Sequence, residues 1–250
     1  MNNKLLRSNS NLSLHYETNY SPEPGIILPV HVNKGPLIKE YLDQLFRVIV
    51  QSINDHKRVL ACRFNLTLPH NCILPDDTYT NGPINRFHKS LKSKIEHDLR
   101  LKRSPHRCRV RYARAREISS NGMPHYHILL LLNLNVYNTP GTADYEGRNI
   151  FRIVTEAWAN ALHIPYEYAI SVVNLSGSNL YRNYWPECCH NDQHWQPAKN
   201  EEWRRYTHYY LEPRDNYNAL PLLFERASYL CKAYSKQYGN HIRSFETSRV

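Results

Sequence analysis

The sequence predicts an α+β protein with a central antiparallel sheet and helices packed on one face of it. Short runs in which apolar and polar residues alternate are typical of strands, and longer runs with apolar residues every three or four positions are typical of helices. The two kinds of run follow the order helix, strand, helix, strand, strand, helix, strand, helix. With 250 residues, the chain can form one large domain around its own hydrophobic core.

The first part of the chain predicts an arm, a helix and a strand. Residues 1–35 are rich in Asn, Ser and Pro, so we expect a flexible N-terminal arm, with the folded domain spanning 36–250. Within 36–57, apolar residues recur at helical spacing and indicate an amphipathic helix. In 59–69 apolar and polar residues alternate up to a proline, which predicts the first strand.

The middle of the chain predicts a second helix followed by a β-hairpin. Residues 81–103 carry an apolar stripe at spacings of four, with Pro83 in the first turn. Residues 107–119 alternate as a strand whose arginines point outward, and Ser-Ser-Asn-Gly at 119–122 predicts a turn. The sequence NGMPHYHILLLLN, residues 121–133, then supplies the partner strand, and its leucine run is typical of a strand buried on both faces.

The last part of the chain predicts a helix at 144–162, a strand at 168–175, a loop insertion at 176–218 and a final helix at 220–238. Without the flanking helices, the order of the elements is βαββαβ, which is the ferredoxin-like or RRM-like arrangement.

The composition indicates a basic, cytosolic protein. Lys and Arg number 32 against 22 Asp and Glu, an excess that favours a polyanionic partner, with nucleic acid first and an anionic membrane surface second. No apolar run approaches the roughly 20 residues that span a bilayer, and the first residues do not resemble a signal peptide. Without such a run we expect no membrane partner. The six cysteines lack framework spacing, so we also expect reduced thiols and a cytoplasmic location.

Two histidines at the start of the leucine-rich strand predict a metal site. His125 and His127 are two residues apart on a strand, so both side chains point to one face about 6.5–7 Å apart. If the hairpin turns near Asn121, Glu117 lies opposite His125 and shares that face. Two imidazoles and a carboxylate make an open site suited to Mn²⁺ or Mg²⁺ and able to bind Zn²⁺. The alternatives are incidental histidines among the fourteen in the chain, and an ion pair of Glu117 with a neighbouring arginine, either Arg114 or Arg116.

A tyrosine and two lysines in the last predicted helix suggest a nucleophile. Tyr229, Lys232 and Lys236 share one face of a helix. Two ammonium groups near a phenol favour its ionised form, and the same lysines could hold phosphates. The alternative is an amphipathic surface helix with an exposed tyrosine, and Tyr234 faces elsewhere.

Other side chains offer contacts to nucleic acid or zinc. Arg107, Arg109 and Arg111 share a strand face and are candidates for phosphate contacts. Tyrosines of the irregular region are candidates for stacking on bases, with loop packing as the alternative (Tyr181, Tyr184, Tyr206 and Tyr209). The sequence ECCHNDQH, 187–194, could bind zinc, although its spacing fits no common zinc finger.

Three motifs in this order resemble the HUH superfamily of replication endonucleases. They are the strand FNLTLP at 64–69, HYH at 125–127 and the Y-x-x-K sequence YLCK at 229–232. The fuller strings REISSNGMPHYHILLLLN and RASYLCKAYSKQYG look like the replication initiators of filamentous phages (inoviruses) and their prophage relatives. The resemblance covers roughly residues 59–239.

The resemblance implies a single-tyrosine DNA nickase that initiates rolling-circle replication in a bacterial host cell. Tyr229 would attack single-stranded or extruded origin DNA, leaving a 5′-phosphotyrosyl intermediate and a free 3′-OH. His125 and His127 carry over as ligands of Mn²⁺ or Mg²⁺, and Lys232 as the lysine beside the tyrosine. Glu117 carries over as the third ligand, a position that varies across the superfamily. The chain has no GxxxxGK[ST] phosphate loop, so a host helicase is a possible partner.

Several other functions remain open at this point. The chain could be a non-catalytic basic DNA- or RNA-binding domain, a metal-dependent nuclease that uses water, or an HUH transposase or relaxase with a different substrate.

Overall fold

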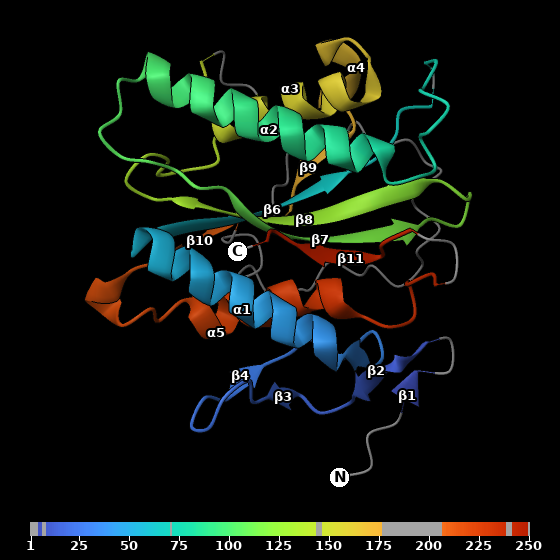
Figure 1. The fold of residues 1–250 in the computed structure, drawn as a ribbon, viewed down its shortest axis with the longest axis vertical. Helices are drawn as coiled ribbons and strands as arrows, with labels where there is room; N and C mark the ends of the chain where they lie inside the picture. The colour runs from blue at the N-terminus through green and yellow to red at the C-terminus, as the bar shows by residue number, and fades with distance from the viewer. Residues whose placement is uncertain are drawn as a thin grey trace, which may run out of the picture.

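A six-stranded antiparallel sheet forms the centre of the protein, with helices packed on both faces (Figure 1). The computed structural model describes residues 5–6, 9–70, 72–143, 147–176, 207–238 and 242–249. The strands lie in the order β10-β6-β8-β7-β11, and β9 also pairs with β6. Their bounds are β6 Val59–Leu66, β7 Arg111–Ile118, β8 Pro124–Asn133, β9 Val173–Leu175, β10 His208–Leu211 and β11 Phe245–Thr247.

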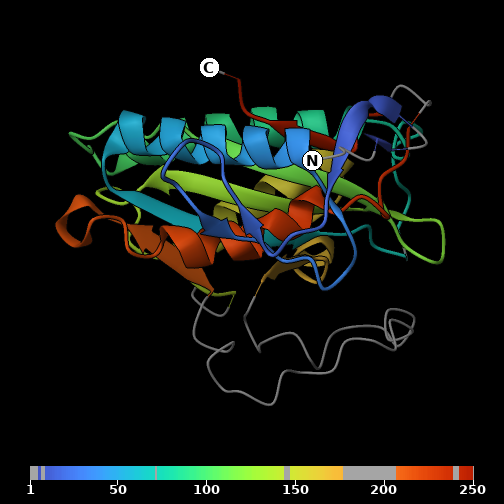
Figure 2. The same ribbon diagram turned by 90° about the horizontal axis from the view of Figure 1, so that it is seen from below.

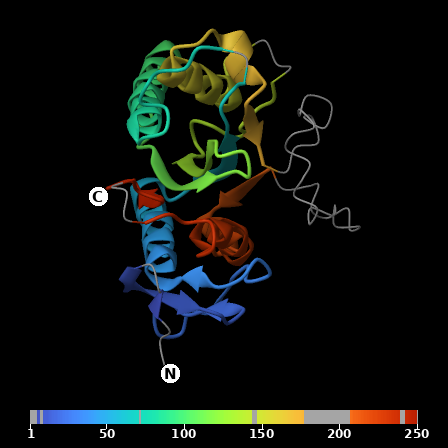
Figure 3. The same cartoon turned by 90° about the vertical axis from the view of Figure 1, so that its right-hand side faces the viewer.

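The predicted βαββαβ core is confirmed by the order β6-α2-β7-β8-α3-β9. In space its strands lie in the order β9-β6-β8-β7, with every neighbouring pair antiparallel. Helices α2 and α3 pack on one face, as expected, and the flanking helices α1 and α5 cover the other (Figures 1 and 3). The helices are α1 Lys39–His56, α2 Gly82–Leu101, α3 Ile150–Leu162, the short α4 Tyr166–Ile170 and α5 Leu220–Ser228.

Strand β8 explains why the leucine run is apolar on both sides. Ile128, Leu130 and Leu132 belong to the core beneath α2 and α3, whereas Leu129 and Leu131 belong to the core beneath α1 and α5. All five residues are fully buried. Because β8 lies between β6 and β7 and is covered on both faces, its first residues are held on a rigid support.

Two predicted segments differ from the structure near β9 and β10. The strand expected at 168–175 is helical over Tyr166–Ile170, and only Val173–Leu175 is extended. Pro165 favours a helix start, and its carbonyl accepts hydrogen bonds from the two amides that close the first turn. Within the loop insertion expected at 176–218, residues 208–211 form β10 and pair with β6. The possible zinc ligands at 187–194, and Tyr181, Tyr184 and Tyr206, lie outside the described residues.

The arginines of β7 do not point into solvent as the sequence suggested. The strand begins at Arg111, and Arg111, Arg114 and Arg116 are all buried. Each guanidinium is held by an oxygen from another element: Arg111 pairs with Asp55, Arg114 with Glu246, and Arg116 donates to the carbonyl of Tyr79. Alternation reports which residues share a face, but not whether another element covers that face.

The N-terminal segment is packed against the domain rather than loosely draped. It contains β1 Leu5–Leu6, β2 Asn9–His15, β3 Asn19–Tyr20, β4 Leu28–Pro29 and β5 Leu37–Ile38. Strand β2 pairs with both β1 and β5, and Tyr20, Leu28 and Val30 are buried beside α1 and α5. Seen from below, the blue N-terminal strands lie in front of these helices (Figure 2). The expectation of a flexible arm missed the few apolar residues that anchor an otherwise polar segment.

Among the described residues, no helix is long and apolar enough to cross a bilayer.

Two adjacent residues test this packing. Leu28 is 3% exposed and Ile27 is 70% exposed. We expect Leu28→Ala to lower the free energy of unfolding by about 2–5 kcal/mol, because it leaves a cavity in the core. Ile27→Ala should change it by less than about 0.5 kcal/mol. Urea unfolding followed by circular dichroism measures both values, and equal small effects would mean that the segment does not pack as described.

Candidate metal centre

The β7–β8 hairpin brings Glu117, His125 and His127 together at the strand ends beside its turn. The turn is closed by hydrogen bonds between Ser119 and Met123, and Gly122 adopts a positive φ of 79°. In the resulting register Glu117 lies directly opposite His125, and His127 lies opposite Ala115. The predicted pairing of the hairpin is therefore confirmed. All three side chains share the sheet face that carries α1 and α5.

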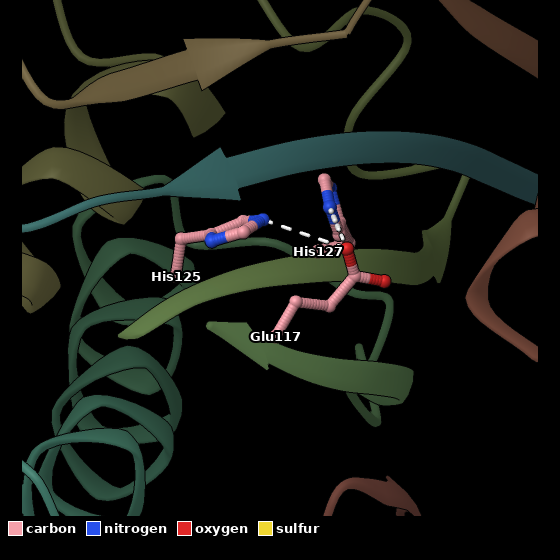
Figure 4. A group of neighbouring side chains, drawn as sticks. All are labelled: Glu117, His125 and His127. Atoms are coloured by element: carbon pink, nitrogen blue, oxygen red, sulfur yellow. Dashed lines mark ion pairs between the residues drawn. The ribbon is translucent and has the colours of Figure 1, made fainter. Parts of the chain in front are cut away.

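The three side chains converge on a single carboxylate oxygen (Figure 4). Oε2 of Glu117 lies 3.5 Å from Nε2 of His125 and 3.3 Å from Nε2 of His127. One donor atom from each residue lies within 4.8 Å of the others, so this group could hold a metal ion. The nitrogen and oxygen donors suit Mn²⁺, Mg²⁺ or Zn²⁺.

Asn65 orients one of the histidines, and the sequence reasoning missed it. It lies opposite His127 on the neighbouring strand β6, and its Oδ1 is 2.6 Å from Nδ1 of His127. If Nδ1–H donates this hydrogen bond to Oδ1, Nε2 carries the lone pair. The sequence shows only that Asn65 is one of the polar residues that alternate with the apolar ones in FNLTLP, which becomes informative only once β6 is paired with β8.

The contact between His127 and Glu117 fits a bound cation. Nε2 of His127 is buried and has no aligned hydrogen bond among the described residues, although it lies 3.3 Å from the carboxylate oxygen. Burial lowers the pKa of His127 to about 4, so the ring is neutral at pH 7. A lone pair and a carboxylate oxygen at this distance repel each other unless a cation lies between them.

Two lysines complete the surroundings of Glu117. Nζ of Lys232 lies 2.8 Å from Oε2, and Nζ of Lys236 lies 3.5 Å from Oε1. Ser235 also donates to Oε1, at 3.0 Å. Burial acts to raise the pKa of Glu117, but its contacts with His125, His127 and Lys236 outweigh burial and hold the pKa well below its usual value. Neither of the arginines considered from the sequence pairs with this carboxylate.

The lysines reach Glu117 by a path that the sequence did not predict. Helix α5 ends at Ser228, a 3-10 turn covers Tyr229–Cys231, and Lys232 is extended with ψ 139°. Lys232 forms an antiparallel bridge with Leu37, and the amide of Ala233 donates to the carbonyl of Pro36 at 3.0 Å. The prediction of one helix over 220–238 is therefore wrong after Ser228, because pairing with the N-terminal segment draws the chain away from the helix axis.

Tyr229 lies beside the three candidate ligands. Its hydroxyl is 2.6 Å from Nζ of Lys232, and its ring centroid is 5.5 Å from that of His127. The residue is half-buried. Burial raises the pKa of Tyr229, and Lys232 only partly opposes this. The lysine therefore favours ionisation, as expected, but does not by itself make the tyrosine a phenolate.

The remaining candidate cations lie elsewhere or are already paired. Arg111 lies six residues before Glu117 on β7, so it is roughly 20 Å from the site. Its Nε is 2.7 Å from Asp55, so its predicted phosphate contact is not supported. Arg107 and Arg109 are exposed at the same distant end. Burial lowers the pKa of Lys236 to about 8, and its contact with Glu117 marks it as part of the cluster rather than a surface cation. Tyr209 is buried on β10.

Comparison with known proteins gives the chain a family. Residues 28–196 match the YagK/YfjJ C-terminal domain. The chain belongs to this family. It is 29% identical to YfjJ of Escherichia coli (strain K12) over 59% of this chain and 76% of YfjJ. It is 27% identical to YagK of the same strain over 86% of this chain and 95% of YagK. Both relatives are described as uncharacterized, and no solved structure matches.

The YagK/YfjJ domain contains the three candidate ligands but not the tyrosine. Glu117, His125 and His127 fall inside residues 28–196, whereas Tyr229 and Lys232 follow it. The family assignment replaces the filamentous-phage initiators as the established relationship, and the resemblance to HUH endonucleases bears only on the proposed function.

Asn65 gives a test of the metal centre. We expect Asn65→Ala to weaken Mn²⁺ binding by roughly 10- to 100-fold, because it removes the group that orients His127. Isothermal titration calorimetry measures this. The matched control is Asn174→Ala, which removes the same side chain from the residue paired with Asn65 on β9. A Mn²⁺ affinity unchanged by Asn65→Ala would contradict the proposed role of this contact.

Proposed function

We propose that this protein is a metal-dependent, site-specific endonuclease for single-stranded DNA that initiates rolling-circle replication. It would nick and transfer strands through a 5′-phosphotyrosyl intermediate on Tyr229. One observation carries the proposal: the hydroxyl of Tyr229 lies 2.6 Å from Lys232, which itself lies 2.8 Å from the candidate ligand Glu117. The segment that carries the tyrosine contacts the hairpin through residues distant in the sequence: Ser235 donates to Glu117, 118 positions earlier. No local sequence pattern therefore accounts for this contact.

The reaction would exchange one phosphodiester for another. Oη of Tyr229 forms a bond to phosphorus while the bond from phosphorus to the 3′-oxygen breaks. The phenol loses its proton and the leaving 3′-oxygen gains one, so the products are a phosphotyrosine and a free 3′-hydroxyl. A divalent cation held by His125, His127 and Glu117 would polarise a phosphate oxygen.

Lys232 is placed to support the loss of the phenol proton. Burial acts to lower the pKa of Lys232, but Glu117 and Tyr229 raise it overall, so the amine is protonated at pH 7. An ammonium group at hydrogen-bond distance from Oη stabilises the negative charge that develops there. Glu117 holds the ammonium in place from the other side.

The charge of the whole chain is consistent with this substrate. A formal net charge of +10 attracts a polyanion such as DNA. The chain has no phosphate-loop motif, so strand separation would depend on a helicase of the host.

Substitution of the tyrosine tests the nucleophile. We expect Tyr229→Phe to abolish the covalent protein–DNA band formed with single-stranded DNA and Mn²⁺, because it removes the attacking oxygen. The control Tyr234→Phe changes a residue that is 63% exposed and should keep the band. Mass spectrometry of the adduct should place the nucleotide on Tyr229. Cleavage without any band would instead indicate a nuclease that uses water, and DNA binding without cleavage would indicate a binding domain.

Removal of divalent cations tests the metal requirement. We expect EDTA to stop both nicking and adduct formation, and added Mn²⁺ to restore them. His127→Ala should lose activity that Mn²⁺ does not restore at the same concentration, because it removes a ligand. The control is His97→Ala, since His97 lies on the exposed face of α2. Full nicking in EDTA would contradict a metal-dependent mechanism.

A further inference from the structure

An arginine on β6 lies against the tyrosine without an acidic partner. Arg63 is two residues before Asn65 and shares its sheet face. Its Cζ lies 5.7 Å from the ring centroid of Tyr229. Among the described residues no carboxylate lies within ion-pair distance of Arg63, unlike Arg111 and Arg114 on β7.

Most of the hydrogen-bonding capacity of Arg63 is unused. Nη1 donates to the carbonyl of Arg226, at 2.8 Å. Nε is shut off from solvent and has no partner among the described residues, whereas the residue as a whole keeps some exposure. Burial lowers the pKa of Arg63 to about 10, so the guanidinium remains charged at neutral pH. A half-buried charge whose Nε is shut off from solvent is costly without a counter-ion, and such a group is usually paired with an anion.

The position of Arg63 relative to the nucleophile is fixed from two sides. The strand places it beside Asn65, and the bond to Arg226 ties it to α5 three residues before Tyr229. The planar guanidinium matches the geometry of a phosphate, to which it can donate two parallel hydrogen bonds.

We propose that Arg63 is the phosphate-binding residue of this site, donating hydrogen bonds to a non-bridging oxygen of the phosphodiester that Tyr229 attacks. This inference rests on the proposed function, because it assumes that the substrate is a phosphodiester. It assigns separate tasks: Lys232 supports the attacking oxygen, and Arg63 holds the phosphate. The competing role is structural, in which Arg63 only caps the carbonyl of Arg226 near the end of α5.

Binding of a minimal phosphodiester separates these roles. The probe is thymidylyl-(3′→5′)-thymidine, titrated into the full chain carrying Tyr229→Phe and Mn²⁺-free, with affinity measured by NMR shifts. We expect Arg63→Met in that background to bind roughly 10- to 100-fold more weakly, since it loses hydrogen bonds to a charged group. Arg100→Met, which removes an exposed arginine of α2 on the opposite face of the sheet, should leave affinity unchanged.

Folding and chemistry provide the controls. Arg63→Met should retain the circular dichroism spectrum and the Mn²⁺ affinity of the parent, because Arg63 is not one of the three candidate ligands. If it does not fold, Arg63→Lys decides: it keeps the charge but loses the forked donors, and affinity should fall roughly three- to tenfold. Unchanged affinity in whichever variant folds, or a parent that does not bind the probe, overturns the inference.

The covalent adduct distinguishes this inference from the proposed function. In the chain that retains Tyr229, Arg63→Met should slow adduct formation at least as strongly as it weakens binding. If the adduct forms at the parent rate, the role of Arg63 is wrong while the nickase stands. If the parent forms no adduct with any single-stranded DNA but Arg63→Met still loses the probe, the nickase is wrong while the phosphate site stands.

Discussion

The buried carboxylate of Glu117 is the interaction around which the site is organised. It receives the two histidines of β8 on one side and the two lysines that follow α5 on the other. A buried anion must be compensated, and here the compensating groups come from two stretches of chain that are distant in the sequence. The cationic groups around it outnumber the single negative charge, so the cluster suits an additional anion. This charge balance supports the proposed phosphate chemistry independently of the resemblance of the motifs.

Rigidity of the sheet gives this cluster its geometry. Strand β8 is buried on both faces over its leucine run. Its first residues lie just outside that core, and His127 among them contacts Tyr229. The neighbouring strands add further groups: β7 supplies Glu117, and β6 supplies Asn65 and Arg63. Side chains on paired strands are held to fixed spacings, which is what a set of metal ligands requires.

Local patterns predicted the hairpin, the βαββαβ order and the meeting of Glu117 with His125, because a short turn determines the register of the strands beside it. They failed where partners come from distant segments. Asn65 and Arg63 become recognisable only after β6 is paired with β8 and α5 is docked. Arg111 was misjudged because alternation cannot show that Asp55 covers it. The sequence predicted that Tyr229 and Lys232 lie close together on one helix. They do lie close together, but the helix ends at Ser228, before both residues.

The pairing of the N-terminal segment with the tyrosine turn has a consequence for the timing of assembly. The amide of His31 donates to Ser228, 197 positions later, and Leu37 bridges to Lys232. During synthesis the hairpin emerges early and can fold with its neighbouring strands, whereas the turn that carries Tyr229 arrives after most of the chain has left the ribosome. The N-terminal strands can therefore complete their contacts only after one of the last segments has been synthesised. The hairpin with the three candidate ligands can therefore form well before Tyr229 is placed beside it, so the candidate site is assembled only when the fold is complete.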